Sequence, residues 1–156
     1  MHKVVGIGEW ACSANESETV VTYALATCVA VTVYCPVRKA AGMIHILLPS
    51  PNSEDDVRLR PSRFASTGVP LLIRHMTQRL GCPFESLEVR IYGGANSIRR
   101  NNLFKIGMRN VEQVRQELRK LNIAPRYIDV GGGISRTLEM SVATGEIRMK
   151  TLPLIS

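Results

Sequence analysis

Residues 19–37 carry no charged side chain, and this long apolar stretch limits what the chain can fold into. Its length approaches the ~20 residues that a membrane-spanning helix needs. Its valines, threonines and Pro36 favour strands instead, and Ala26-Thr27-Cys28 divides it into two runs of strand length. We therefore expect two buried strands, at about 19–26 and 29–35, and no direct insertion into a membrane.

The rest of the chain alternates between strand and helix patterns. A hairpin turn at 35–39 is expected to lead into a strand at 41–48, and polar segments at 13–17 and 49–61 are expected to be a turn and a surface loop. Further strands are predicted at 3–8, 87–93, 123–130, 135–142 and 146–151, the last two joined through Thr144-Gly145. One amphipathic helix runs to Leu80 and either begins near Pro70 or is kinked there after starting near Ser62, and a second covers 109–121. No linker or repeat divides the chain, so residues 1–156 are predicted to form a single domain.

Basic charge is concentrated in the second part of the sequence. Residues 1–60 hold five basic and six acidic side chains, whereas residues 61–156 hold 15 and seven. Such a surface could meet an acidic protein, anionic lipid or RNA, or simply be solvated. Aromatic residues make up only 5% of the chain, which disfavours nucleic acid, because a surface that stacks bases needs several exposed rings.

The cysteines and glycine-rich segments indicate a chain without a metal or organic cofactor. Its four cysteines follow no Cys-x-x-Cys pattern and no secretory signal pattern precedes them, so we expect free thiols in a reducing cytoplasm. Zinc would need four ligands at close pairwise spacing, which the sequence does not supply. Gly93-Gly94 and Gly131-Gly132-Gly133 lack the lysine and the spacing of nucleotide-binding loops, and we interpret them as tight turns.

Cys28 and His45 are the candidate catalytic pair. The hairpin at 35–39 would bring both into one sheet, where the imidazole could accept the thiol proton. Thr22, on the preceding strand, could hold the second imidazole nitrogen through its hydroxyl. A buried cysteine and a histidine satisfied in the core are the alternative interpretation of the same residues.

Six segments in order resemble the CheD family of bacterial chemotaxis proteins: VVGIGEW (4–10), LATCVAV (25–31), GMIHILLP (42–49), YGGA (92–95), IGMRNV (106–111) and DVGG (129–132). The family commonly has Gly-Ser before the nucleophile, where this chain has Ala26-Thr27. We expect the β-branched Thr27 to narrow the site.

The resemblance implies a cytoplasmic chemoreceptor glutamine deamidase. The implied fold is a three-layer α/β/α sandwich with mixed, largely antiparallel strands and two main helices. Cys28, His45 and Thr22 would then be nucleophile, base and orienting hydroxyl, with backbone N–H groups near Thr27 and Val29 stabilising the oxyanion. An enzyme is expected to lower the pKa of the Cys28 thiol, whereas a non-catalytic adaptor on the same fold would tolerate its replacement by alanine.

The resemblance also implies partners. Receptor cytoplasmic helices are rich in Glu and Gln, so a basic rim would suit them, and a CheC-type phosphatase is a further expected partner. We predict that rim at Arg99, Arg100, Lys105 and Arg109, on a monomeric protein.

Overall fold

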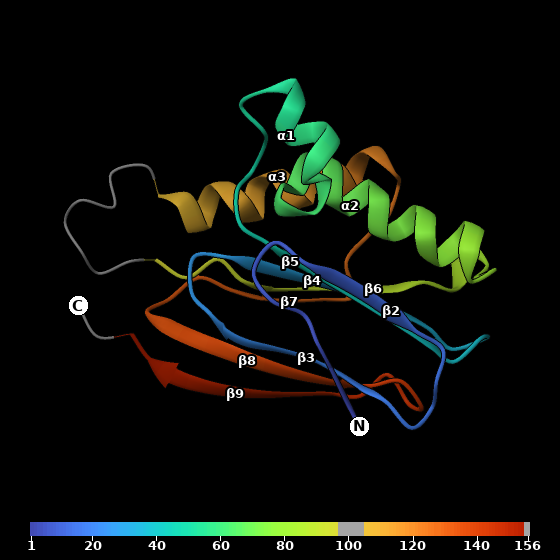
Figure 1. Cartoon of the computed structure of the whole chain (residues 1–156). Coiled ribbons are helices and arrows are strands. Elements are labelled where there is room, and N and C mark those ends of the chain that lie inside the picture. The colour runs from blue at the N-terminus through green and yellow to red at the C-terminus, as the bar shows by residue number, and fades with distance from the viewer. Residues whose placement is uncertain (97–104, 155–156) are drawn as a thin grey trace.

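Two β-sheets lie face to face (Figure 1). One of them lies between the helices and the other sheet, and we call it the inner sheet; the other is the outer sheet. The computed structural model describes residues 1–96 and 105–154. The inner sheet has the strand order β2-β5-β4-β6-β7 and the outer sheet the order β1-β3-β8-β9. The strands are β1 (His2–Val4), β2 (Trp10–Ser13), β3 (Thr19–Leu25), β4 (Val29–Cys35), β5 (Ala40–Ile46), β6 (Glu88–Gly93), β7 (Tyr127–Val130), β8 (Ile134–Ser141) and β9 (Ile147–Pro153).

The helices form the layer above the inner sheet (Figure 1). They are α1 (Glu54–Leu59), α2 (Ala65–Arg74) and α3 (Ile106–Lys120), with 3-10 turns η1 (Pro61–Arg63) and η3 (Phe84–Ser86) and a π-helical turn η2 (His75–Arg79) that continues α2. Apolar side chains of α2 and α3, such as Leu72 and Leu118, are fully buried against this sheet. The two longer helices are those that the apolar spacing predicts.

The central strands β4 and β5 are buried on both faces, which explains the absence of charge in the second half of the 19–37 stretch. In the first half, β3 exposes Tyr23 and Ala24, so only the second of the two predicted strands is buried throughout. In β4, Val29, Val31 and Val33 belong to the core beneath the helices. Ala30 and Tyr34 belong to a second core between the two sheets. A strand covered on both sides needs apolar residues at every position rather than at alternate ones.

The outer sheet has the alternating burial of a sheet with one solvated face. In β8 every second residue, Arg136, Leu138 and Met140, is buried. In β9, Arg148 and Lys150 are exposed. This amphipathic sheet covers the side of the inner sheet that the helices leave open.

The structure confirms the α/β class, the two main helices and the mixed, largely antiparallel strands. Only the β1–β3 and β6–β7 pairs are parallel within the described strands. In the described residues the layers follow the order helices, inner sheet, outer sheet (Figure 1). The layer on the side opposite the helices is therefore made of strands. Because more buried and more exposed side chains alternate along β8 and in the first part of β9, the outer sheet has one face that closes the core without helices.

Two local features differ from the sequence prediction. Residues 10–13 form β2 at the sheet edge, paired with β5. The predicted loop 49–61 contains α1, which Ser53 caps by accepting a hydrogen bond from the Asp56 N–H. Of the two starts considered for the first amphipathic helix, the structure has the earlier one, because α2 begins at Ala65 and continues through Pro70. Within residues 1–96 and 105–154, no helix is long and apolar enough to cross a membrane.

Candidate active site

Cys28, His45 and Thr22 meet in the core between the two sheets. Ala30 of β4 pairs with His45 of β5, and Cys28 lies two residues before Ala30, so Cys28 and His45 are diagonal neighbours on one face. Cys28 belongs to the same inter-sheet cluster as Ala30. Thr22 comes from β3 of the outer sheet and contacts the His45 ring across the interface. The hairpin predicted at 35–39 joins β4 to β5 and so places the Cys28 segment beside His45 in one sheet, whereas Thr22 reaches His45 from the other sheet.

Hydrogen bonds determine which nitrogen of His45 carries the proton. Thr22 Oγ1 lies 2.7 Å from the Val5 carbonyl oxygen and 2.7 Å from His45 Nδ1. A carbonyl can only accept, so the hydroxyl proton is donated to Val5 and His45 Nδ1–H donates to Thr22. Nε2 therefore has the free lone pair, and this buried atom lacks a hydrogen-bond partner in the part of the chain that the structure describes. An imidazole held in this way is ready to accept a proton at Nε2.

Burial keeps both members of the pair neutral. Cys28 is 8% exposed and His45 is 2% exposed. Burial raises the pKa of the Cys28 thiol to about 11. Burial lowers the pKa of His45 to about 4, and the nearby Glu9 carboxylate opposes that shift. The resting site thus differs from the lowered thiol pKa expected from the sequence, because desolvation disfavours both charged forms.

This charge state predicts the reactivity of Cys28 toward iodoacetamide, which alkylates thiolates. We expect slow alkylation at neutral pH, with a rate that rises about tenfold per pH unit until the pH approaches the pKa of about 11. Mass spectrometry of digested samples would measure the rate at Cys28, with Cys12 as an internal comparison. A rate that levels off below about pH 8 would instead indicate a thiolate–imidazolium pair.

Backbone hydrogen bonds fix the segment around Cys28. The Gly94 N–H donates to the Cys28 carbonyl at 2.8 Å, and the Ala95 N–H donates to the Ala26 carbonyl at 2.7 Å. Gly93 has a φ of 108° and its Cα faces the Cys28 carbonyl so closely that a Cβ would collide with it. The structure therefore agrees with the interpretation of Gly93-Gly94 as a tight turn. This turn holds residues 26–28, which we call the nucleophile segment.

The residues predicted for the oxyanion site differ in their surroundings. Thr27 is half-buried just before β4, whereas Val29 is fully buried and pairs with Ile46 in the ladder. Cys28 lies between them, and its N–H has no acceptor within residues 1–96 and 105–154. The N–H groups that precede β4 are therefore the ones available to a substrate.

Two of the four predicted rim residues lie beside the segment that carries Cys28. Lys105 and Arg109 are exposed at the start of α3, whose Gly107 contacts the Gly94–Ala95 turn. Arg99 and Arg100 lie outside the described residues.

Sequence reasoning did not single out Asn110 or Arg136, both of which are buried near the nucleophile segment. Asn110 Nδ2 donates to the carbonyls of Thr27 and Leu47. Arg136 donates to Asp129 at 3.1 Å and to the carbonyls of Gly93 and Gly131 at 3.3 and 2.9 Å. Both lie in or beside the segments that carry the family resemblance, but only the fold shows which carbonyls they reach.

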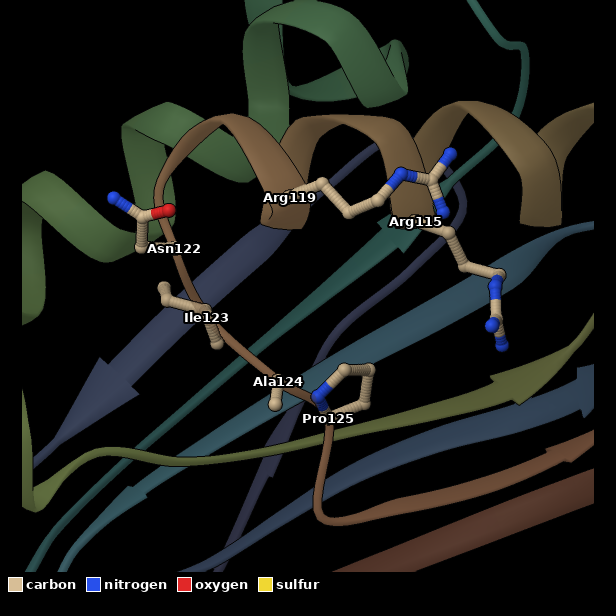
Figure 2. Close-up of a pocket in the computed structure, with 6 residues that line it drawn as sticks. All are labelled: Arg115, Arg119, Asn122, Ile123, Ala124 and Pro125. Atoms are coloured by element: carbon tan, nitrogen blue, oxygen red, sulfur yellow. The ribbon is translucent and has the colours of Figure 1, made fainter.

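Other parts of the described chain offer less chemistry. Cys12, Cys35 and Cys82 are free thiols, and no group of three His, Cys, Asp or Glu side chains in the described ranges could hold a metal. A cavity of about 400 Å³ lies at the C-terminal end of α3, where Arg115 and Arg119 project from the helix and Asn122–Pro125 follow it (Figure 2). This cavity has two guanidinium groups but no nucleophile or base.

Two solved structures share the fold. The structure of the hypothetical protein YfiH from Bacillus licheniformis aligns with a TM-score of 0.51 and 18% identity, over 78% of this chain and 49% of that one. The structure of YlmD from Geobacillus stearothermophilus aligns with a TM-score of 0.52 and 11% identity, over 78% of this chain and 48% of that one. The chain thus spans about half the length of these structures, and the likeness concerns the fold alone.

Sequence comparisons identify the family. The family model for CheD, described as CheD chemotactic sensory transduction, matches residues 47–151. A probable chemoreceptor glutamine deamidase CheD from Syntrophotalea carbinolica is 42% identical over 94% of this chain and 91% of its own length. The chemoreceptor glutamine deamidase CheD of Thermotoga maritima is 35% identical over 96% of this chain and 92% of its own length. With matches of this identity along nearly its whole length, the chain belongs to the CheD family.

Proposed function

We propose that this protein is a hydrolase that converts glutamine side chains of chemoreceptors to glutamate through a thioester on Cys28. The names of the curated relatives support this activity and substrate. The observation that carries the proposal is the hydrogen-bond chain from Val5 through Thr22 to His45 Nδ1, which leaves Nε2 free on the face that holds Cys28. A core histidine without a catalytic role has no need of an unpartnered, buried nitrogen.

The first half of the reaction forms the thioester. The Cys28 thiol transfers its proton to His45 Nε2 as sulfur attacks the amide carbon of the glutamine. The resulting oxyanion accepts hydrogen bonds from backbone N–H groups at Thr27 and Cys28. The imidazolium then donates its proton to the leaving nitrogen, so ammonia departs and the acyl group stays on sulfur.

The second half releases glutamate. Water gives a proton to His45 Nε2 and its oxygen attacks the thioester carbon. Collapse of this intermediate breaks the carbon–sulfur bond, and the proton returns from the imidazolium to the Cys28 sulfur. Throughout, Thr22 accepts from Nδ1–H and stabilises the transient imidazolium. Side chains, backbone and water supply every group in this sequence of steps.

The exposed cations at the start of α3 support receptor helices as the substrate. Lys105 and Arg109 lie next to the segment that carries Cys28, where they would attract a helix rich in glutamate and glutamine. We also propose that the protein acts as a monomer and binds a CheC-type phosphatase.

Mass spectrometry of a purified receptor cytoplasmic fragment tests the activity. Incubation with the protein in water enriched in heavy oxygen is expected to convert selected glutamines to labelled glutamates and to release ammonia. A folded protein that binds the fragment without converting any glutamine would instead be the adaptor expected as the alternative.

Replacing Thr22 tests the hydrogen-bond chain. Thr22→Val keeps the shape of the side chain but removes the acceptor for His45 Nδ1–H, so we expect kcat to fall about 10- to 100-fold. Thr22→Ser keeps the hydroxyl and is expected to retain most of the activity. Equal kcat values for the valine and serine variants in the deamidation assay would show that the hydroxyl does not assist His45.

A further inference from the structure

Asn110 connects the segments that carry the nucleophile and the base. It is fully buried in α3, and its Nδ2 donates to the Thr27 carbonyl at 3.0 Å and to the Leu47 carbonyl at 3.1 Å. Thr27 immediately precedes Cys28, and Leu47 follows His45 by two residues. A single side-chain amide therefore fixes the chain on both sides of the candidate site.

The orientation of this amide is determined by its two acceptors. With the amide turned over, Oδ1 would face the carbonyl oxygens of Thr27 and Leu47, which have no proton to donate. In the observed orientation both Nδ2 protons are used, while Oδ1 is buried with no partner in the described part of the chain. An unpaired buried acceptor is unfavourable, and such local costs are typical of functional sites.

Gly107 allows α3 to approach closely enough for this contact. A Cβ at Gly107 would collide with the carbonyl oxygens of Ala95 and Gly94, so only glycine fits there. Gly94 in turn donates its N–H to the Cys28 carbonyl. The first turn of α3 is thus placed directly against the turn that holds Cys28, and Asn110 lies on the next turn of the same helix.

The contact with Thr27 bears on the N–H of Cys28. In a trans peptide the carbonyl of one residue and the N–H of the next point in opposite directions, so fixing the Thr27 carbonyl also fixes the Cys28 N–H. That N–H has no acceptor in the described residues, and a donated hydrogen bond on the carbonyl strengthens it as a donor. We infer that Asn110 is a positioning residue that orients the Thr27–Cys28 peptide so that the Cys28 N–H stabilises the oxyanion of the acyl-transfer step.

This inference rests on the proposed deamidation and predicts which step depends on Asn110. Attack on an amide creates an oxyanion, whereas alkylation of Cys28 by iodoacetamide does not. A residue that acts by orienting the peptide must therefore affect acyl transfer much more than alkylation. A residue that only packs beside the thiol would affect both equally.

The test compares Asn110→Leu with the wild type on the receptor fragment. We expect kcat to fall about 10- to 100-fold, with KM and the alkylation rate of Cys28 each within about threefold of wild type. Gln113→Leu is the matched control, because Gln113 lies one turn further along α3 and donates to Glu117 rather than to the nucleophile segment. It is expected to leave kcat unchanged.

A wild-type kcat in Asn110→Leu, or equal losses in kcat and alkylation rate, would overturn the inference. If Asn110→Leu does not fold, Asn110→Ser provides the same comparison with a smaller side chain. The carbonyl-carbon NMR shift of Thr27 is also expected to move in the serine variant, since the donated hydrogen bond is lost. A wild-type protein that converts no glutamine would contradict the proposed function itself, so the two failures are distinguishable.

Discussion

Replacing Cys28 with alanine is expected to lower kcat for glutamine deamidation by at least about 1,000-fold. The substitution removes the atom that would form the thioester, and the described site holds no other thiol on this face of the inner sheet. The loss should appear entirely in the chemical step, so binding of the receptor fragment is expected to persist. Mass spectrometry of the fragment after incubation with equal amounts of each protein would measure the difference.

Cys12→Ala is the matched control for this experiment. Cys12 lies in β2 and packs against the core beneath the helices, on the opposite side of the inner sheet from Cys28. Its removal is expected to leave kcat unchanged. Deamidation by Cys28→Ala at a rate near that of wild type would exclude Cys28 as the nucleophile.

Replacing Arg136 with methionine is expected to lower the free energy of unfolding by about 2–4 kcal/mol. Arg136 is 2% exposed and is bound to Asp129 and to two carbonyls of the inner-sheet turns, so it links β8 to β6 and β7. Methionine would leave the Asp129 carboxylate and the Gly131 carbonyl without this partner. Urea unfolding would measure the change.

Arg148→Met separates this effect from the general loss of a positive charge. Arg148 is largely exposed on β9 and, among the described residues, pairs only with exposed Glu146. Its replacement is expected to change the free energy of unfolding by less than about 1 kcal/mol. Similar changes in the free energy of unfolding for the two variants would show that buried Arg136 stabilises the fold no more than an exposed arginine does.

The candidate catalytic pair, Cys28 and His45, could be predicted from the sequence because a local feature aligns the two residues. A short hairpin between residues 35 and 40 fixes the register of β4 and β5, and that register makes Cys28 and His45 diagonal neighbours. The strand β3 could also be predicted, because it lies in the uncharged stretch at residues 19–37. The contact of Thr22 with His45, however, depends on how the two sheets pack.

The remaining features arise from contacts between distant segments. Asn110 and Arg136 act through carbonyl oxygens, which every residue has, so no side-chain pattern marks their partners. Likewise, β2 is a short edge strand whose pairing with β5 is long-range. Its sequence contains a tryptophan and a cysteine but no alternation long enough to indicate a strand.

The position of Thr22 in the outer sheet has a consequence for how the protein becomes active during synthesis. β3 pairs with β8 as well as with β1, so the sheet that carries Thr22 can be completed only after residues 134–141 have left the ribosome. Until then the Cys28 and His45 segments can pair with each other, but the imidazole lacks the hydroxyl that orients it. We therefore expect nascent chains to carry an incomplete version of the proposed relay of Thr22, His45 and Cys28, which the pairing of β3 with β8 completes.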